Sequence, residues 1–125
     1  MVSQCLRQGL GEAYAAIGNL YSSGRGVQRD YNEALQWYQK TAGQGHASAQ
    51  HQIGKFYYNG QGVGSNKELA YFWEVIAAEC ASGKDRDYYS SVRDKRAAEI
   101  SETNRLAIDD DAKEWLRERG FEYTS

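Results

Sequence analysis

The sequence predicts an all-α protein, an αα-hairpin solenoid built from short repeats. Three observations predict this class. The chain of 125 residues has no proline but 13 glycines, which suits short helices separated by glycine turns. Its apolar residues recur with helical spacing. The chain also matches itself when it is shifted by 36 residues. With 41% hydrophobic and 26% charged residues, the composition is that of a folded globular protein.

The internal repeat consists of ten identities in one register. They are alanines, isoleucines, glycines, tyrosines, valines and tryptophans, the residue types that set helix packing and turns. Such agreement indicates one supersecondary unit that occurs twice. The pairs are Ala13 with Ala49, Ile17 with Ile53, Gly18 with Gly54, Tyr21 with Tyr57, Gly24 with Gly60, Gly26 with Gly62, Val27 with Val63, Ala34 with Ala70, Trp37 with Trp73, and Ala42 with Ala78.

Each unit is predicted to fold as a helix, a glycine loop and a second helix. The apolar side chains of the first helix recur every three to four residues, as at Ala13, Ile17 and Leu20. Gly24 and Gly26 then end this helix, because glycine adopts the positive φ values that close such a turn. A dinucleotide-binding loop would instead follow a strand, so the glycines are interpreted as structural turns.

The second helix of each unit is predicted from its cap. In unit one Asp30 is expected to be the N-cap, and Glu33 completes a capping box. In unit two the nearer box is Ser65 with Glu68, one residue before Asn66, which stands in the register of Asp30.

Trp37 and Trp73 are predicted to fill the space between hairpin layers, with Trp73 on a buried face. Small residues at Ala13, Gly18 and Ala34 let neighbouring backbones approach closely. Each hairpin then buries its face only against its neighbours, as in a solenoid.

The segment AYAAIGNLYSSGRGVQRDYNEALQWYQKTAGQGHASAQHQIGKFYYNGQGV resembles the Sel-1-like repeat, a short relative of the tetratricopeptide repeat. The resemblance covers residues 9–83. Residues 84–125 resemble the carboxyl cap of bacterial members, with Arg93-Asp94 in one helix and Ala112 and Trp115 in the last. The resemblance implies repeats at 11–46 and 47–83 and a capping helical hairpin at 84–125. Residues 1–10 are then the tail of a truncated preceding repeat.

Composition excludes several classes of function. A net charge of −2 provides no basic field for nucleic acid, and no apolar run approaches the ~20 residues of a membrane helix. Asp109, Asp110 and Asp111 cannot converge on one ion from a helix, so a charged face paired with Arg105 and Lys113 is expected. No cofactor or metal is predicted.

The two cysteines are expected to be small apolar fillers rather than a disulfide. Cys5 and Cys80 lie two repeat units apart, on the order of 20 Å for helices ~8–10 Å apart. Disulfide-bonded Cα atoms lie within ~7 Å.

Candidate binding residues are those on the first helices that the repeat does not fix. A tyrosine that the scaffold does not need is a good recognition residue, because it loses little side-chain entropy on docking. His46 is interpreted as structural, since the family commonly has histidine in this turn, whereas His51 is interpreted as part of the binding face. No catalytic residue is predicted. The predicted concave-face set is Tyr14, Asn19, Ser22, His51, Lys55, Tyr58, Tyr88 and Tyr89.

These observations favour a non-catalytic scaffold that binds a protein or peptide on its concave face, the role that the family resemblance also implies. An immunity-type inhibitor of a toxin or enzyme is the alternative. A small hydrolase of cell-wall-type ligands is a third, for which the sequence offers no nucleophile with a base beside it. A bacterial protein is expected, periplasmic or exported if an upstream signal was removed and otherwise cytoplasmic.

A weak homodimer is predicted through the amino-terminal edge. A solenoid that starts within a hairpin presents an apolar face, which tends to associate with a second copy. The residues of this face are Leu6, Leu10, Tyr14 and Ile17.

Overall fold

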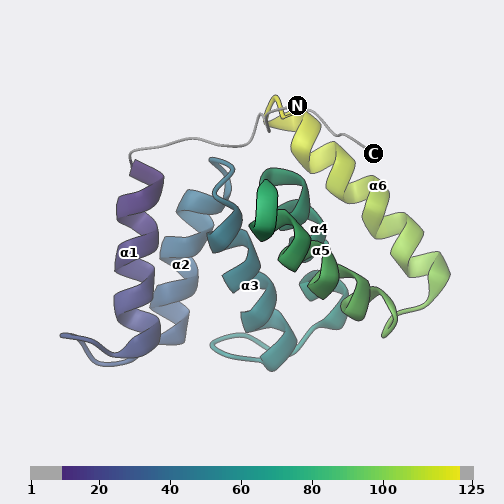
Figure 1. The fold of residues 1–125 in the computed structure, drawn as a ribbon. Helices are drawn as coiled ribbons and strands as arrows, with labels where there is room; N and C mark the ends of the chain where they lie inside the picture. The colour runs from purple at the N-terminus through teal and green to yellow at the C-terminus, as the bar shows by residue number, and fades with distance from the viewer. Residues whose placement is uncertain (1–9, 122–125) are drawn as a thin grey trace.

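A computed structural model describes residues 10–121, which fold into six α-helices joined by turns (Figure 1). The all-α αα-hairpin solenoid predicted from the sequence is confirmed. The helices are α1 (Leu10–Ser23), α2 (Tyr31–Ala42), α3 (Ala47–Asn59), α4 (Lys67–Cys80), α5 (Gly83–Ala97) and α6 (Glu102–Glu118).

Successive helices pack side by side as antiparallel hairpins. Helix α1 pairs with α2, and α3 pairs with α4; α2 also packs on α3 and so joins the two units. Helices α5 and α6 both pack on α4, and α6 runs diagonally at the carboxyl end of the array (Figure 1). The first helices of the hairpins, α1, α3 and α5, therefore share one side of the molecule.

The glycine loops form the turns that the sequence predicts. Gly24, Gly26, Gly60 and Gly62 all have φ between 71° and 76°, the left-handed region that favours glycine. Gly62 is needed for a second reason. A Cβ atom built there would lie 2.9 Å from the backbone of Tyr31, so the loop of unit two sits directly against the start of α2.

The N-caps follow the repeat register. The backbone N–H of Glu33 donates to the Asp30 carboxylate at 3.1 Å, which confirms that cap. In unit two Asn66, not Ser65, is the cap: its Oδ1 accepts from the N–H of Leu69 at 3.0 Å. The prediction of Ser65 was wrong because its hydroxyl is used elsewhere, donating to a backbone carbonyl at the end of α3.

The core consists of clusters between neighbouring hairpins. One lies between α2 and α3 and includes Tyr38 and Ile53; another lies between α4 and α6 and includes Leu116. Trp73 packs against both clusters, and its ring lies 5.6 Å from that of Trp115. Its predicted role as a wedge between layers is confirmed, although the side chain is only partly buried.

Equivalent positions are less buried at the amino-terminal edge. Ala49 is buried in α3, whereas Ala13, its match in α1, is exposed, and Leu20 is 43% exposed. Their predicted burial was wrong, because α1 packs chiefly on α2 and no described helix covers its outer side. The Tyr14 ring turns instead toward Trp37, at a centroid distance of 5.7 Å.

The structure describes only part of the edge through which a homodimer is predicted. Leu6 lies outside the described residues, as does most of the predicted tail at 1–10, while Tyr14 and Ile17 are half-buried. Self-association through this edge therefore stays a prediction.

Cys80 is buried and disulfide-bonded, so the expectation that it is a simple apolar filler was wrong. That expectation used a separation of two repeat units between the cysteines, counted along the sequence. Cys5, the other cysteine of the chain, lies outside the described residues.

The carboxyl-terminal helices close the solenoid. Ser101 caps α6 by accepting from the N–H of Asn104. Asp109 pairs with Arg105 at 3.3 Å, as predicted, and also accepts a hydrogen bond of 2.6 Å from the Tyr71 hydroxyl. Burial and the Asp109 carboxylate raise the pKa of Tyr71. Asp109 thus fixes α6 to α4 rather than lying on a purely solvated face.

Candidate functional site: a groove across the first helices

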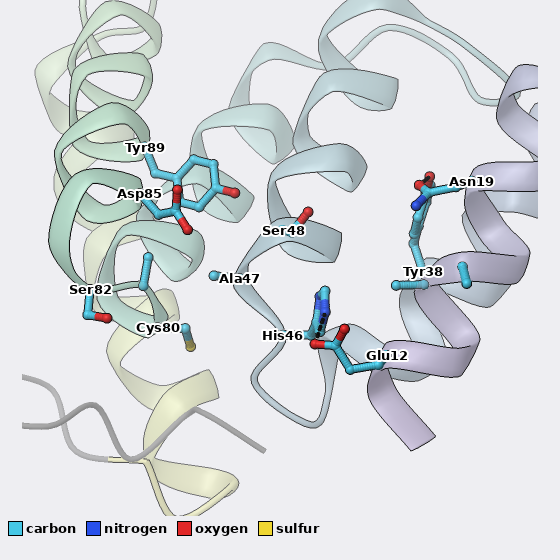
Figure 2. Close-up of a pocket in the computed structure, with 13 residues that line it drawn as sticks. Glu12, Asn19, Tyr38, His46, Ala47, Ser48, Cys80, Ser82, Asp85 and Tyr89 are labelled. Atoms are coloured by element: carbon cyan, nitrogen blue, oxygen red, sulfur yellow. Dashed lines mark hydrogen bonds and ion pairs between the residues drawn. The ribbon is translucent and has the colours of Figure 1, made fainter. Parts of the chain in front are cut away.

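A groove of about 780 Å³ crosses the side of the molecule formed by the first helices. Helix α1 supplies one wall, α5 the other, and the start of α3 lies between them (Figure 2). Two predicted binding residues, Asn19 and Tyr89, line it. The full lining is Glu12, Ala15, Ala16, Asn19, Tyr38, His46, Ala47, Ser48, Cys80, Ala81, Ser82, Asp85 and Tyr89.

On the α1 wall, a buried tyrosine orients the predicted contact residue. Tyr38 packs so tightly on α1 that a Cβ at Gly18 would lie 2.8 Å from its ring. Its hydroxyl donates to Oδ1 of Asn19 and lies 3.4 Å from Oγ of Ser22. Burial raises the pKa of Tyr38. With its oxygen engaged, Asn19 presents its amide N–H₂ as a donor to the groove.

Between the walls, the turn into α3 is fixed by His46. Its Nδ1 accepts from the N–H of Ala49 at 3.2 Å, so His46 is the N-cap of α3 and its predicted structural role is confirmed. The other ring nitrogen, Nε2, lies 3.5 Å from Oε1 of Glu12. The cap therefore links the first turns of α3 and α1 at the mouth of the groove.

The α5 wall is formed by Tyr89 and the first turn of that helix. Tyr89 is buried; burial raises the pKa of its hydroxyl, and a hydrogen bond with Ser48 opposes this shift. Asp85 is exposed in the first turn of α5. Ser82 occupies the N-cap position, but its side chain makes no capping hydrogen bond.

Beyond Tyr89, the space between α3 and α5 is filled by a buried polar pair, His51 and Glu74. Nδ1 of His51 lies 2.9 and 3.0 Å from the two carboxylate oxygens of Glu74. His51 is 7% exposed and Glu74 only 1%. The His51 ring contacts the rings of Tyr88 and Tyr89 at centroid distances of 5.5 and 4.8 Å.

The Glu74 carboxyl is held in an unusual environment. Burial raises its pKa, while the hydrogen bond from His51 and the positive charges of Arg96 and Lys55 lower it; burial has the larger effect. Gly54 makes room for the group, since a Cβ there would lie 2.9 Å from Oε2 of Glu74. This arrangement joins α3 to α4 through an ionisable pair within the core.

The structure brings only some of the predicted binding residues together. His51, Tyr88 and Tyr89 form one aromatic cluster between α3 and α5, but His51 and Tyr89 are buried, and only Tyr88, at 57% exposure, faces outward. Lys55 is exposed close by. Tyr14 and Ser22 are half-buried and do not line the groove.

Tyr58 is engaged within the protein rather than free. Its hydroxyl donates to the Glu99 carboxylate at 2.8 Å, and the Arg96 guanidinium lies 3.6 Å from its ring centroid. That hydrogen bond, and Lys67 at 3.4 Å, lower the pKa of Glu99. Tyr58 therefore supports the contact between α3 and the end of α5.

Sequence reasoning missed three acidic residues: Glu12 and Asp85 at the groove and Glu74 below it. The repeat register held a signal for Glu74. Its match in unit one is Tyr38, a buried position, so a carboxyl there required a buried partner.

Within residues 10–121, no three His, Cys, Asp or Glu side chains gather as metal ligands. None of the helices in that part of the chain is long and apolar enough to cross a membrane.

The Sel1 repeat pattern matches residues 11–46 and 47–82, more than half of the chain. The chain belongs to the Sel1 repeat family. The family resemblance predicted from the sequence is thereby confirmed. Proteins with Sel1 repeats are typically protein-interaction scaffolds and generally non-catalytic.

Two solved structures are similar to this Sel1 repeat chain. A Sel1 repeat protein from Oxalobacter formigenes is 36% identical over 66% of the chain, with a TM-score of 0.59. A protective antigen of uropathogenic Escherichia coli with an SLR fold is 24% identical over 86% of the chain, with a TM-score of 0.77, and shows the fold alone. The chain spans 34% and 22% of their respective lengths. No curated protein matches it.

Proposed function

We propose that this chain is a non-catalytic scaffold that binds a segment of another protein in the groove between α1 and α5. The observation that carries the proposal is the groove itself, which crosses all three first helices. Its volume of about 780 Å³ falls within the ~300–1,000 Å³ of typical ligand sites.

The lining of the groove supports a binding role. Its residues at Ala15, Asn19 and Ser48 are positions where the two repeats differ in sequence, so the scaffold does not dictate them. Asn19 offers an amide donor to a peptide carbonyl. Tyr89 supplies a rigid aromatic wall, a side chain typical of protein interfaces. Lys55 and Tyr88 extend the same side beyond the groove as exposed contacts.

A groove-filling variant tests this function. Ala16 lines the groove and is exposed, so Ala16→Trp adds bulk there without entering the core. Ala107→Trp, on an exposed face of α6, is the matched control. Peptides are first selected from a random displayed library against the wild-type protein, and their dissociation constants are then measured by titration calorimetry.

We expect wild type and Ala107→Trp to bind the selected peptides equally, and Ala16→Trp to bind them at least roughly tenfold more weakly. Equal binding by Ala16→Trp would overturn the groove as the site. The double variant Lys55→Glu with Tyr88→Ala reports on the outer part of the face, where a smaller loss is expected.

A further inference from the structure

The charges on the groove are of one sign. Its lining contains two carboxylates, Glu12 on the α1 wall and Asp85 on the α5 wall, and no lysine or arginine among the described lining residues (Figure 2). Among the described lining residues, His46 is the one side chain that could carry a positive charge. A ligand that enters between the walls therefore passes between two negative charges.

His46 lies beside Glu12 without cancelling its charge. Because Nδ1 of His46 accepts the N–H of Ala49, the hydrogen of the neutral ring lies on Nε2, which faces Glu12 at 3.5 Å. The imidazole lies beside the Glu12 carboxylate, which is itself 66% exposed. Its negative charge stays available to a cation.

Asp85 is the matching charge on the other wall. It is exposed and, among the described residues, takes part in no ion pair, whereas its neighbour Arg86 pairs with Glu79. Figure 2 shows its carboxylate on the groove side of α5, below Tyr89.

Between the carboxylates, the lining includes four alanines beside the hydroxyls of Ser48 and Ser82. The alanines come from α1, from the start of α3 and from the turn before α5, and they give this part of the groove its apolar area. Lysine and arginine have a long apolar stem and a cationic head, so their stems cover such a surface while their heads stay near its rim. The small residues are Ala15, Ala16, Ala47 and Ala81.

We propose that the groove, as the binding site of the function proposed above, selects an extended peptide segment that carries a lysine or arginine. The stem of this side chain packs on the alanines, and its head lies between Glu12 and Asp85. Asn19 donates its amide hydrogen to a carbonyl of the peptide. The inference names the chemistry of the partner and rests on the groove being a peptide site.

The test uses heptapeptides that differ at one position. The probe is acetyl-Ala-Gly-Ser-Arg-Ser-Gly-Ala-amide; its controls carry citrulline, which is nearly isosteric and neutral, or glutamate in place of arginine. Each is titrated into the isotopically labelled full chain, and binding is read from amide chemical shifts. The protein variants are Glu12→Gln with Asp85→Asn, and, as a matched control with the same change in net charge, Asp110→Asn with Asp111→Asn on α6.

We expect the arginine peptide to shift amides of residues 12–19, 46–48 and 82–89, and to bind about tenfold more tightly than the citrulline peptide. Glu12→Gln with Asp85→Asn should remove that preference, while the α6 control should keep it. Raising the salt concentration from about 0.05 M to 0.5 M should also reduce it.

Three results would overturn the inference. Equal shifts of the groove amides by all three peptides would leave the groove as a peptide site but remove its charge selectivity. An equal loss of affinity in the α6 control would assign the effect to overall charge. The absence of groove shifts with any peptide, while library-selected peptides still bind there, would exclude a basic segment and retain the proposed function.

Discussion

Two neighbouring gaps on the same side of the molecule are built from matching repeat positions, yet one is open and the other filled. In the gap beside α1, position 15 is alanine and position 38 is tyrosine. In the gap beside α5, the matching positions are His51 and Glu74, which join as a buried polar pair under Tyr89. The two gaps therefore differ in the side chains at these two positions, and in the second gap the rings of Tyr88 and Tyr89 also pack on His51.

The difference also shows where a repeat protein can place polar groups. The alanine leaves space in unit one, and Tyr38 directs its single hydroxyl to Asn19 at the edge of the groove. In unit two the carboxyl of Glu74 is deeper and depends on one histidine for its hydrogen bonds. A charged group in this place makes the second gap sensitive to any change in its partner.

The largest expected loss of stability comes from breaking the buried pair of His51 and Glu74. Glu74→Ala leaves Nδ1 of His51 without its acceptor and opens space beside Gly54, so it should lower the free energy of unfolding by about 3–5 kcal/mol. Glu74→Gln keeps an acceptor and the shape, and should cost much less. Denaturant titrations of both variants provide the measurement; a similar loss in both would mean that the charge of Glu74, not its hydrogen bond, stabilises the gap.

The next largest loss of stability is expected at the two tryptophans of the repeat, Trp73 and Trp37. Trp73 packs on clusters from both sides and on Trp115, so Trp73→Ala should cost about 3 kcal/mol, the lower end for a tryptophan because the ring is partly exposed. Trp37 contacts Tyr14 and Lys40 at the edge, so Trp37→Ala should cost about half as much. Thermal unfolding with calorimetry tests the order, and equal costs would contradict the interlayer role of Trp73.

The smallest expected effect is a dependence on pH. Burial raises the pKa of Glu74 in the folded protein, despite His51, Arg96 and Lys55 nearby, so the folded state holds this proton to higher pH than the unfolded state. The stability from this group is present below about pH 4.3 and is lost as pH rises through the raised folded value. The free energy of unfolding of Glu74→Gln minus that of wild type should therefore increase with pH.

Unfolding curves collected across this range of pH provide the measurement. Gly64→Ala is the control, because a Cβ there meets nothing within 4 Å and the change adds no titrating group. A flat difference for Glu74→Gln, like that of the control, would show that the Glu74 carboxyl is not penalised by its burial.

Much of the fold was predictable because it depends on the repeat. The turns at Gly60 and Gly62 and the Trp73 wedge follow from residues that recur in register, where local conformation and packing agree. The Asp30 cap follows from its local capping box. The cap at Asn66 was missed because a good local capping box at Ser65 competed with the register, and the register prevailed.

The site was less predictable, because its geometry depends on contacts distant in sequence. His51 and Glu74 are 23 residues apart, and His51 was expected on the surface because only its own helix was considered. Asn19 and Tyr89 were predicted as unexplained polar and aromatic residues on first helices, and both line the groove. Glu12 and Asp85 were missed because they look like ordinary first-turn acids.

The contact of Gly62 with the start of α2 has a mechanical consequence. At this contact the backbone of one hairpin lies directly against the start of α2 in the other, and the contact lies at the end of α3 opposite to the groove. Helix α3 has 13 residues and is therefore about 20 Å long, so this contact and the groove lie at opposite ends of one helix. We expect a side chain at position 62 to displace the start of α2, and so to change the width of the groove at the other end of α3. The absence of a side chain at Gly62 thus helps to determine the spacing between the two hairpins.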